Sequence, residues 1–169
     1  MHVSFKVSLL LLIVTLTSCG FQLRGTGKFD FESIYIQSEA ATRVTDEVKH
    51  LLNEQNIKVT AEANEAQVLL YLRHEGIRHR MLSVSAISGK LEEVEINLFV
   101  DMEVTRADGS PLLENITLKL LRDYSFDETA VLAVGAEQEI IQKEMFRDVV
   151  AQVMRRLQTV KTKSQDSVE

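Results

Sequence analysis

Cys19 carries the only thiol of this 169-residue chain, and a thiol can serve as a nucleophile, a metal ligand or the acceptor of a covalent group. It follows Leu16-Thr17-Ser18, at the end of an apolar run over residues 7–16 that has Lys6 just ahead of it. A cation, a short apolar stretch and small residues in this order are typical of a secretory leader. The run is too short to span a bilayer. The sequence therefore predicts a leader over residues 1–18 and a mature chain that begins with a cysteine.

The residues around Cys19 resemble the lipobox of bacterial lipoproteins, in which a leucine and two small or hydroxylated residues precede the modified cysteine. The resemblance implies that the Cys19 sulfur takes an S-diacylglycerol and that its freed amine takes an N-acyl chain such as palmitate. Because two or more acyl chains hold a protein firmly to a membrane, we expect an anchored protein that does not span the bilayer. Gly20, in place of an aspartate, is similar to lipoproteins sorted to the outer membrane. The alternative is an ordinary signal peptide that a cysteine follows by chance.

A basic cluster stands out in the middle of the chain, where Arg78 and Arg80 are close together and Lys90 lies across the next turn. Guanidinium groups bind phosphate bidentately, so these three residues are candidates for a site that binds phosphate groups. The alternative is cross-strand charge pairing with Glu93 and Glu95, in which each pair contributes less than about 1 kcal/mol. The sequence leaves both interpretations open.

The turn at Ser88-Gly89 predicts a hairpin that brings this cluster next to the following strand. In the expected register, Arg80 lies opposite Asn97 and Arg78 opposite Phe99. Both arginines then lie on the same face of the sheet as the acidic side chains of the neighbouring strand.

No other residue pattern predicts catalysis, a metal site or a cofactor. His74 and His79 are five residues apart on a predicted strand, which places them on opposite faces. Neighbouring carboxylates such as Glu92 and Glu93 alternate across a strand in the same way. Motifs for serine hydrolases, zinc proteases and phosphate-binding loops are absent from the sequence. We therefore expect a protein that is not an enzyme, with no cofactor besides the covalent lipid.

Composition predicts one domain and excludes some partners. The formal net charge is −6, and the leader contains one cation and no acid, so the mature chain is still more acidic. This charge argues against a nucleic-acid-binding protein, which would carry a basic surface. The expected organisation is the leader, a lipidated N-terminus and tether over residues 19–28, a single domain over 29–160, and a disordered tail over 161–169.

Hydrophobic periodicity predicts the elements that position these residues. Strands are expected near residues 31–37, 68–86, 93–104 and 112–122, and helices near 41–55 and from about 125 to 160. We expect a kink or a bulge at Gly76 in the second strand. Ser125 and Glu128 have the spacing of a capping box at the start of the last helix.

The hairpin between the last two strands allows a parity argument. Apolar residues occupy even positions in both strands, so a loop with an odd number of residues is needed to put them on one face. A three-residue loop over 108–110, with a left-handed residue at or next to Gly109, satisfies this. We expect Met102 to face Ile116 and Val100 to face Leu118.

These elements predict an α/β (α+β) two-layer sandwich, with a mixed sheet of about four strands and two helices packed on one face. The other face stays open. Its side chains are acidic, with Phe99 in the middle. Such a face suits either solvent or a polar partner surface.

Two segments resemble the lipopolysaccharide-assembly lipoprotein E family. The first is Cys19-Gly20-Phe21-Gln22-Leu23-Arg24-Gly25. The second is the last helix, with Phe126-Asp127, Leu132-Ala133, Glu137-Gln138, Ile140-Ile141, Lys143-Glu144-Met145, Asp148 and Arg156-Leu157. Together with the order of elements, the resemblance covers nearly the whole mature chain.

The resemblance implies an outer-membrane lipoprotein that plugs the lumen of the lipopolysaccharide (LPS) transport β-barrel in a one-to-one complex, helps that barrel assemble and contacts LPS. It also implies that LPS is met by basic residues near the turn after the second long strand and ahead of the last helix. Lys90 stands at the first place, whereas Val134 and Gly135 stand at the second. The alternative is a free-standing envelope lipoprotein that binds LPS or another anionic glycan.

Overall fold

The computed structural model describes residues 28–162. The predicted leader, the lipidation site Cys19 and most of the predicted tail lie outside this range. In chain order the elements are β1 (Ser33–Glu39), α2 (Thr42–Glu54), β2 (Lys58–Val59), a 3₁₀ turn (Ala63–Glu65), β3 (Val68–Val84), β4 (Leu91–Arg106), β5 (Pro111–Ser125), a second 3₁₀ turn (Glu128–Ala130) and α3 (Val131–Thr159).

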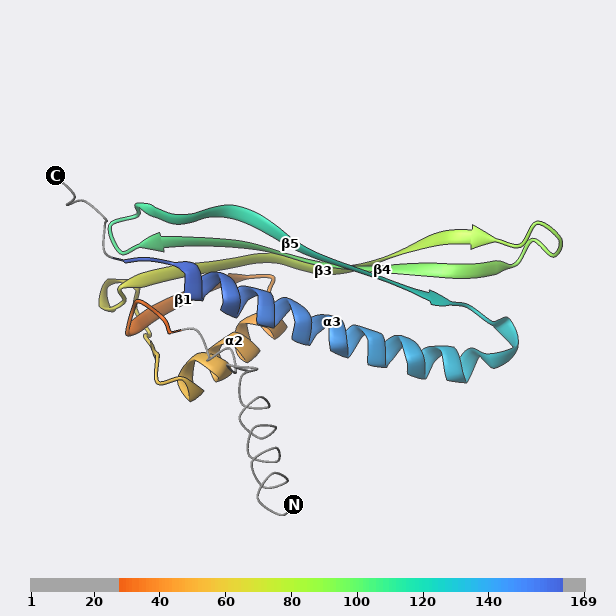
Figure 1. Cartoon of the computed structure of the whole chain (residues 1–169), viewed down its shortest axis with the longest axis horizontal. Coiled ribbons are helices and arrows are strands. Elements are labelled where there is room, and N and C mark those ends of the chain that lie inside the picture. The colour runs from red at the N-terminus through yellow and green to blue at the C-terminus, as the bar shows by residue number, and fades with distance from the viewer. Residues whose placement is uncertain (1–27, 163–169) are drawn as a thin grey trace, which may run out of the picture.

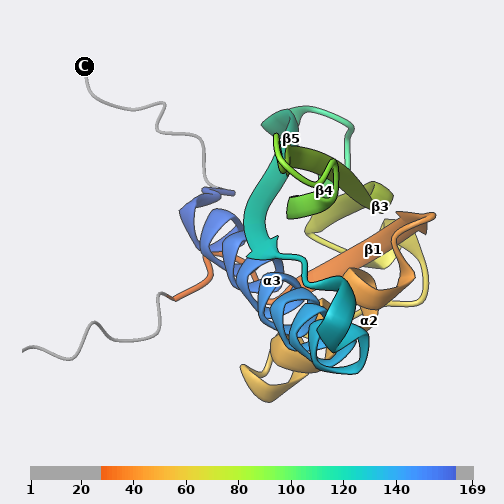
Figure 2. The same ribbon diagram turned by 90° about the vertical axis from the view of Figure 1, so that its right-hand side faces the viewer.

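One mixed sheet and two helices form the two-layer architecture that the sequence predicted. The strand order is β2-β1-β3-β4-β5. Strand β1 runs parallel to β2 and β3, and the remaining pairs are antiparallel. The sheet has one strand more than expected, because β2 consists of only two residues and is too short to give a periodic pattern. Both helices lie on the same face of the sheet (Figures 1 and 2), and we call the other one the open face.

Strand β4 is the central strand of the long hairpins and shows the predicted alternation. Its even-numbered residues from Val94 to Val104 point to the helices and are buried, and Leu98 is 1% exposed. The predicted pairings of Met102 with Ile116 and Val100 with Leu118 are both confirmed. Gly109 has the expected left-handed backbone, at a φ of 85°. The loop is one residue longer than predicted, and register shifts after Met102 absorb the difference.

The helices bury the apolar stripes that their periodicity predicted. In α2 the buried residues include Val44, Val48 and Leu52, and in α3 they include Met145, Val149, Val153 and Leu157. Together with the even-numbered residues of β4 they form one continuous core. None of the helices within residues 28–162 is both long and apolar enough to cross a bilayer.

The start of α3 differs from the predicted capping box. Ser125 is the last residue of β5, and the N-cap position of α3 is Ala130, which makes no side-chain cap bond. Asp127 instead accepts hydrogen bonds from the backbone N–H and the hydroxyl of Thr129, at 2.8 and 2.7 Å. These bonds lower the pKa of Asp127. The pattern was misread because a short 3₁₀ turn separates β5 from α3, which shifts the helix start by several residues.

The β3–β4 hairpin differs from the expected register by two residues. Val84, not Ala86, pairs with Leu91, so the connection is longer than the turn at Ser88-Gly89 suggested. Arg80 therefore lies opposite Glu95, and Arg78 lies opposite Asn97. A shift of two residues leaves every side chain on its face. The predicted face of both arginines is correct, and only their partners differ.

The two ends of the described chain meet beside the sheet. The Thr162 N–H donates to the Asp30 carboxylate at 2.8 Å, and the Thr162 hydroxyl donates to the Asp30 carbonyl at 2.8 Å. The Arg106 side chain donates to the Thr162 carbonyl at 3.4 Å. These bonds fix the chain directly after α3 to the segment that leads into β1.

Candidate functional site

A bulge in β3 connects the open face of the sheet to helix α2. The pairing with β4 shifts between Arg73 and Gly76, which confirms a bulge next to the predicted glycine. His74 takes a left-handed backbone at a φ of 53°. The Glu75 carboxylate accepts a hydrogen bond from the Val44 N–H in the first turn of α2, at 3.0 Å. Because the N-cap of α2 makes no side-chain bond, Glu75 supplies the acceptor that this helix end lacks.

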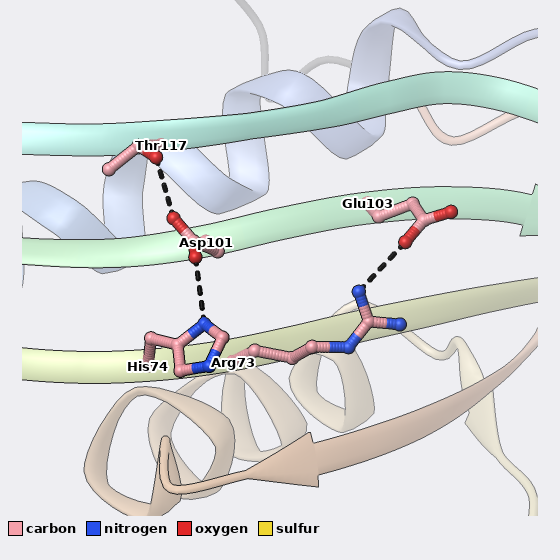
Figure 3. A network of polar contacts seen from close by, with 5 residues as sticks. All are labelled: Arg73, His74, Asp101, Glu103 and Thr117. Atoms are coloured by element: carbon pink, nitrogen blue, oxygen red, sulfur yellow. Dashed lines mark hydrogen bonds and ion pairs between the residues drawn. The ribbon is translucent and has the colours of Figure 1, made fainter.

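Next to the bulge, the acidic side chains of β4 are matched by polar partners from both neighbouring strands (Figure 3). The Asp101 carboxylate lies 2.9 Å from the His74 ring nitrogen and accepts a hydrogen bond from Thr117 at 2.6 Å. Arg73 donates to Glu103 at 2.9 Å. The bond from Thr117, followed by His74 and Arg73, lowers the pKa of Asp101. This part of the open face is therefore an ordered polar network with its charges compensated.

Beyond the bulge, Gly76 allows an aromatic ring to lie across β3. A Cβ atom built on Gly76 would be 2.5 Å from Cζ of Phe99, so the ring occupies the space of a side chain. The Arg78 guanidinium stacks on the same ring, 4.7 Å from its centroid. The absence of a side chain at Gly76 thus positions Phe99, and Phe99 in turn holds Arg78 on the open face.

A hollow of about 430 Å³ lies on the open face beside this stack. We call it the basic hollow. It is lined by Arg78, His79, Arg80, Glu95, Asn97, Lys119 and Leu121, which come from β3, β4 and β5. Because opposite positions on paired strands share a face, the register brings Arg78, Asn97 and Leu121 into one row across the hollow.

The charges around the basic hollow favour an anion. Arg80 donates to the Glu95 carboxylate at 3.2 and 3.4 Å, so the acidic residue in the lining of the hollow is already paired. Arg78 and Lys119 make no ion pair with any residue in 28–162. The Asn97 Oδ1 atom is buried and finds no hydrogen-bond partner in the same range. The hollow therefore offers two uncompensated cations to a phosphate or carboxylate group. The Asn97 oxygen is an acceptor and could bind only a donor, such as a hydroxyl group of the same ligand.

The structure brings together two of the three predicted binding residues and adds Lys119, which the sequence analysis did not propose. Arg78 and Arg80 both line the hollow, whereas Lys90 is not part of its lining and lies close enough to Asp127 to lower the pKa of that carboxyl. Lys119 was missed, although its position was accessible from the sequence. The parity argument for the last hairpin already placed Lys119 on the open face, opposite Phe99.

Two further features of the described chain have side chains that could form a site. His74 and His79 lie on opposite faces as predicted, because His79 reaches Gln138 of α3 at 3.1 Å while His74 contacts Asp101. Residues 28–162 contain no cluster of three potential metal ligands. A hollow of about 570 Å³ between α2 and α3 has mixed charge, with Arg43 stacked on Phe146 at 3.7 Å. Its lining mixes the cations Arg43, Lys143 and Arg147 with the acids Asp46 and Glu47, so it is a weaker candidate for an anionic ligand.

Comparison with known proteins identifies the family. The family described as "LptE: Lipopolysaccharide-assembly" matches residues 31–157, which is most of the chain and includes every helix and strand except the last residues of α3. The chain belongs to the LptE family. It is 28% identical over 155 residues to the LPS-assembly lipoprotein LptE of Photorhabdus laumondii, covering 89% of this chain and 82% of that protein. The resemblance seen in the sequence is confirmed.

Solved structures support the LptE fold. The solution structure of an uncharacterized lipoprotein B from Nitrosomonas europaea has a TM-score of 0.72 and 28% identity, covering 82% of this chain and 90% of that one. The crystal structure of the rare lipoprotein B from Shewanella oneidensis has a TM-score of 0.62 and 24% identity, covering 74% and 92%. This chain is thus an LPS-assembly lipoprotein of the LptE family with the two-layer fold described above.

Proposed function

We propose that this LptE-family protein is an outer-membrane lipoprotein that plugs the LPS-transport β-barrel, assists its assembly and takes part in inserting LPS into the outer leaflet. The family match over residues 31–157 carries the proposal. The open face supports it, because its acidic side chains lie half-buried among compensating cations such as Arg73 and Arg80. Since the lumen of a transport barrel is polar, a polar and ordered face suits contact with its wall.

In this proposal the lipid on Cys19 delivers the domain and the protein surface keeps it in place. An S-diacylglycerol and an N-acyl chain anchor the mature N-terminus in the membrane. Residues 28–162 then lie on the periplasmic side and in the barrel lumen, in a one-to-one complex with the barrel protein. The proposed role needs no catalytic group and no cofactor besides this covalent lipid.

The partner is tested by isolating the tagged lipoprotein at its native expression level after mild detergent extraction. We expect a large β-barrel protein to co-purify in equimolar amount. Recovery of the lipoprotein without a barrel protein would reject its proposed role as a plug. Labelling with radioactive palmitate, with a Cys19→Ala variant as the control, tests the lipid anchor separately.

We further propose that the basic hollow contacts the phosphate groups of LPS, through Arg78, Arg80 and Lys119, with Lys90 on the adjoining turn. The two uncompensated cations, Arg78 and Lys119, support this proposal. The same surface would also serve a free-standing lipoprotein that binds LPS or another anionic glycan. Which of the two holds depends on whether the barrel co-purifies.

The hollow is tested by LPS binding to paired variants. Arg78→Ala with Lys119→Ala removes both uncompensated cations, and since a bond to a charged group contributes about 1.5–3 kcal/mol, we expect at least a tenfold loss of affinity. Arg122→Ala is the matched control, because Arg122 is an exposed cation of the same strand that points to the helix side and pairs with Asp148. An equal loss of LPS affinity in the double variant and in the Arg122→Ala control would show only a general charge effect, and would reject the hollow as the LPS-binding site.

A further inference from the structure

The outer half of β3 is an open strand edge. Strand β1 pairs with β3 only from Val68 to Arg73, and the pairing ends where the bulge begins. From Gly76 to Val84 the strand pairs with β4 alone, and no other element within residues 28–162 pairs with its second side. Figure 1 shows β3 and β4 continuing together well past the end of β1. We call residues Gly76–Val84 the distal edge.

The distal edge has only part of the protection that open strands usually carry, in the charges of Arg78 and Arg80 and in the register shifts between Met81 and Val84. It contains no proline and no lysine. It exposes apolar side chains instead, with Met81 71%, Leu82 43% and Val84 53% exposed. About half of its backbone N–H and C=O groups point away from β4, in the alternation that an antiparallel strand requires. An edge of this kind is a template for another strand.

Two possible occupants fit this edge poorly. Insertion into lipid would place the free backbone groups in hydrocarbon, where open sheet edges are not tolerated. Pairing with a second copy in an antiparallel two-fold arrangement would bring Arg78 and Arg80 of one chain beside those of the other on the open face. Like charges directly opposite each other destabilise a strand pair.

We propose that the distal edge binds an extended segment of a partner polypeptide by β-strand addition. The partner strand carries acidic residues on the open-face side and apolar residues on the helix side. The chain itself shows this complementarity, because on the other side of β3 the acid Glu95 pairs with Arg80 and the apolar Val94 pairs with Met81. A strand on the distal edge meets the same two rows of β3 side chains. This inference does not depend on the LPS-binding role of the basic hollow.

The probe is a synthetic peptide with the sequence of residues 91–100, Leu-Glu-Glu-Val-Glu-Ile-Asn-Leu-Phe-Val, which is the natural complement of β3. Amide hydrogen exchange of the mature protein is measured with and without the peptide. We expect slower exchange at alternate residues of the distal edge and no change from Val68 to Arg73, where β1 already occupies the edge. Exchange that does not change at the distal edge would overturn the proposal.

Two modifications separate strand addition from binding by side chains alone. N-methylation of either the odd or the even amides blocks hydrogen bonding along one of the two edges of the peptide strand. We expect the peptide methylated on one pattern not to bind and the peptide methylated on the other pattern to bind as before. Arg78→Glu lowers the affinity for the acidic peptide by up to about fivefold. A peptide with lysine in place of its glutamates shows the reverse, and binds the Arg78→Glu variant more tightly than the parent protein. Equal binding of both methylated peptides would refute backbone pairing.

The competing occupants have distinct outcomes. Protection of the distal edge by neutral phospholipid vesicles, without protection by the peptide, would overturn the proposal in favour of a lipid surface. Protection that rises with protein concentration in the absence of peptide would overturn it in favour of a second copy. Lys119 lies outside the distal edge, so Lys119→Ala leaves peptide binding unchanged but lowers phosphate binding. The two measurements therefore test the basic hollow and the distal edge separately.

Discussion

The contact between Gly76 and Phe99 makes a sharp prediction about a pair of substitutions. A Cβ atom at position 76 would lie 2.5, 3.0 and 3.1 Å from three ring atoms of Phe99. Gly76→Ala therefore forces the ring off β3, because the contact is too short for any side chain to accept. The backbone itself does not resist the change, since Gly76 is not among the residues with a positive φ. The cost of the substitution thus depends on the ring.

The size of the effect follows from three contributions. Overpacking costs about 1–3 kcal/mol, although here the ring can swing toward solvent, which favours the lower end of the range. Loss of the stacked Arg78 guanidinium adds about 0.5–1 kcal/mol at an exposed site. Replacing glycine restricts the unfolded chain and returns about 0.4–1 kcal/mol. We expect Gly76→Ala to lower the free energy of unfolding by about 1–2 kcal/mol.

The decisive measurement repeats Gly76→Ala in a Phe99→Ala background. Without the ring only the restriction of the unfolded chain remains, so the same substitution becomes neutral or stabilises the protein by up to about 1 kcal/mol. Urea unfolding followed by circular dichroism gives all four corners of the cycle. Additive effects, with the same loss in both backgrounds, would refute the idea that Gly76 is required by Phe99.

Three further predictions concern the cap, the acidic row and the core. Glu75→Ala removes the acceptor of the Val44 N–H and lowers the free energy of unfolding by about 1–2 kcal/mol, whereas Glu75→Gln, which keeps an acceptor, loses less; thermal melts of both variants check this. Because the pKa of Asp101 is lowered from 3.8 in the folded state, its stabilisation is complete at neutral pH and is lost as the pH falls through the folded pKa. Unfolding of Asp101→Asn followed below about pH 4 should show a weaker dependence on pH than the parent, and an unchanged dependence would count against this account. Leu98→Ala, at a fully buried position, costs about 2–5 kcal/mol in urea unfolding, against less than about 0.5 kcal/mol for the control Leu121→Ala, which is 44% exposed.

Much of the sheet was predictable because strand periodicity carries face information directly. The alternation of β4 assigned Val94 to the helix side and Glu95 to the open face, and parity then gave the pairing of Met102 with Ile116. The exact partners of Arg78 and Arg80 were not predictable in this way. A register shift of two residues changes the partner and leaves the hydrophobic pattern intact, so only the length of the connection after Val84 could decide it.

The site was predicted in part for the same reason. Arg78 and Arg80 were found because two arginines close together stand out in an acidic chain. Lys119 is isolated in the sequence, and it joins them only because β5 lies beside β4 in the sheet. The role of Glu75 as a cap for α2 had no local signal at all, since the helix and its acceptor are 31 residues apart.

By itself, the sequence determined the fold class, the faces on which the residues of β4 and their partner residues in β5 lie, and the membership of the LptE family, because these follow from local periodicity and from residue identity along the chain. Only the tertiary structure decided which cations converge on the basic hollow, which residue caps α2 and where β1 stops pairing with β3. These depend on register, on a bulge and on contacts between distant segments. Such contacts are set by how the elements pack together, and no single segment encodes them.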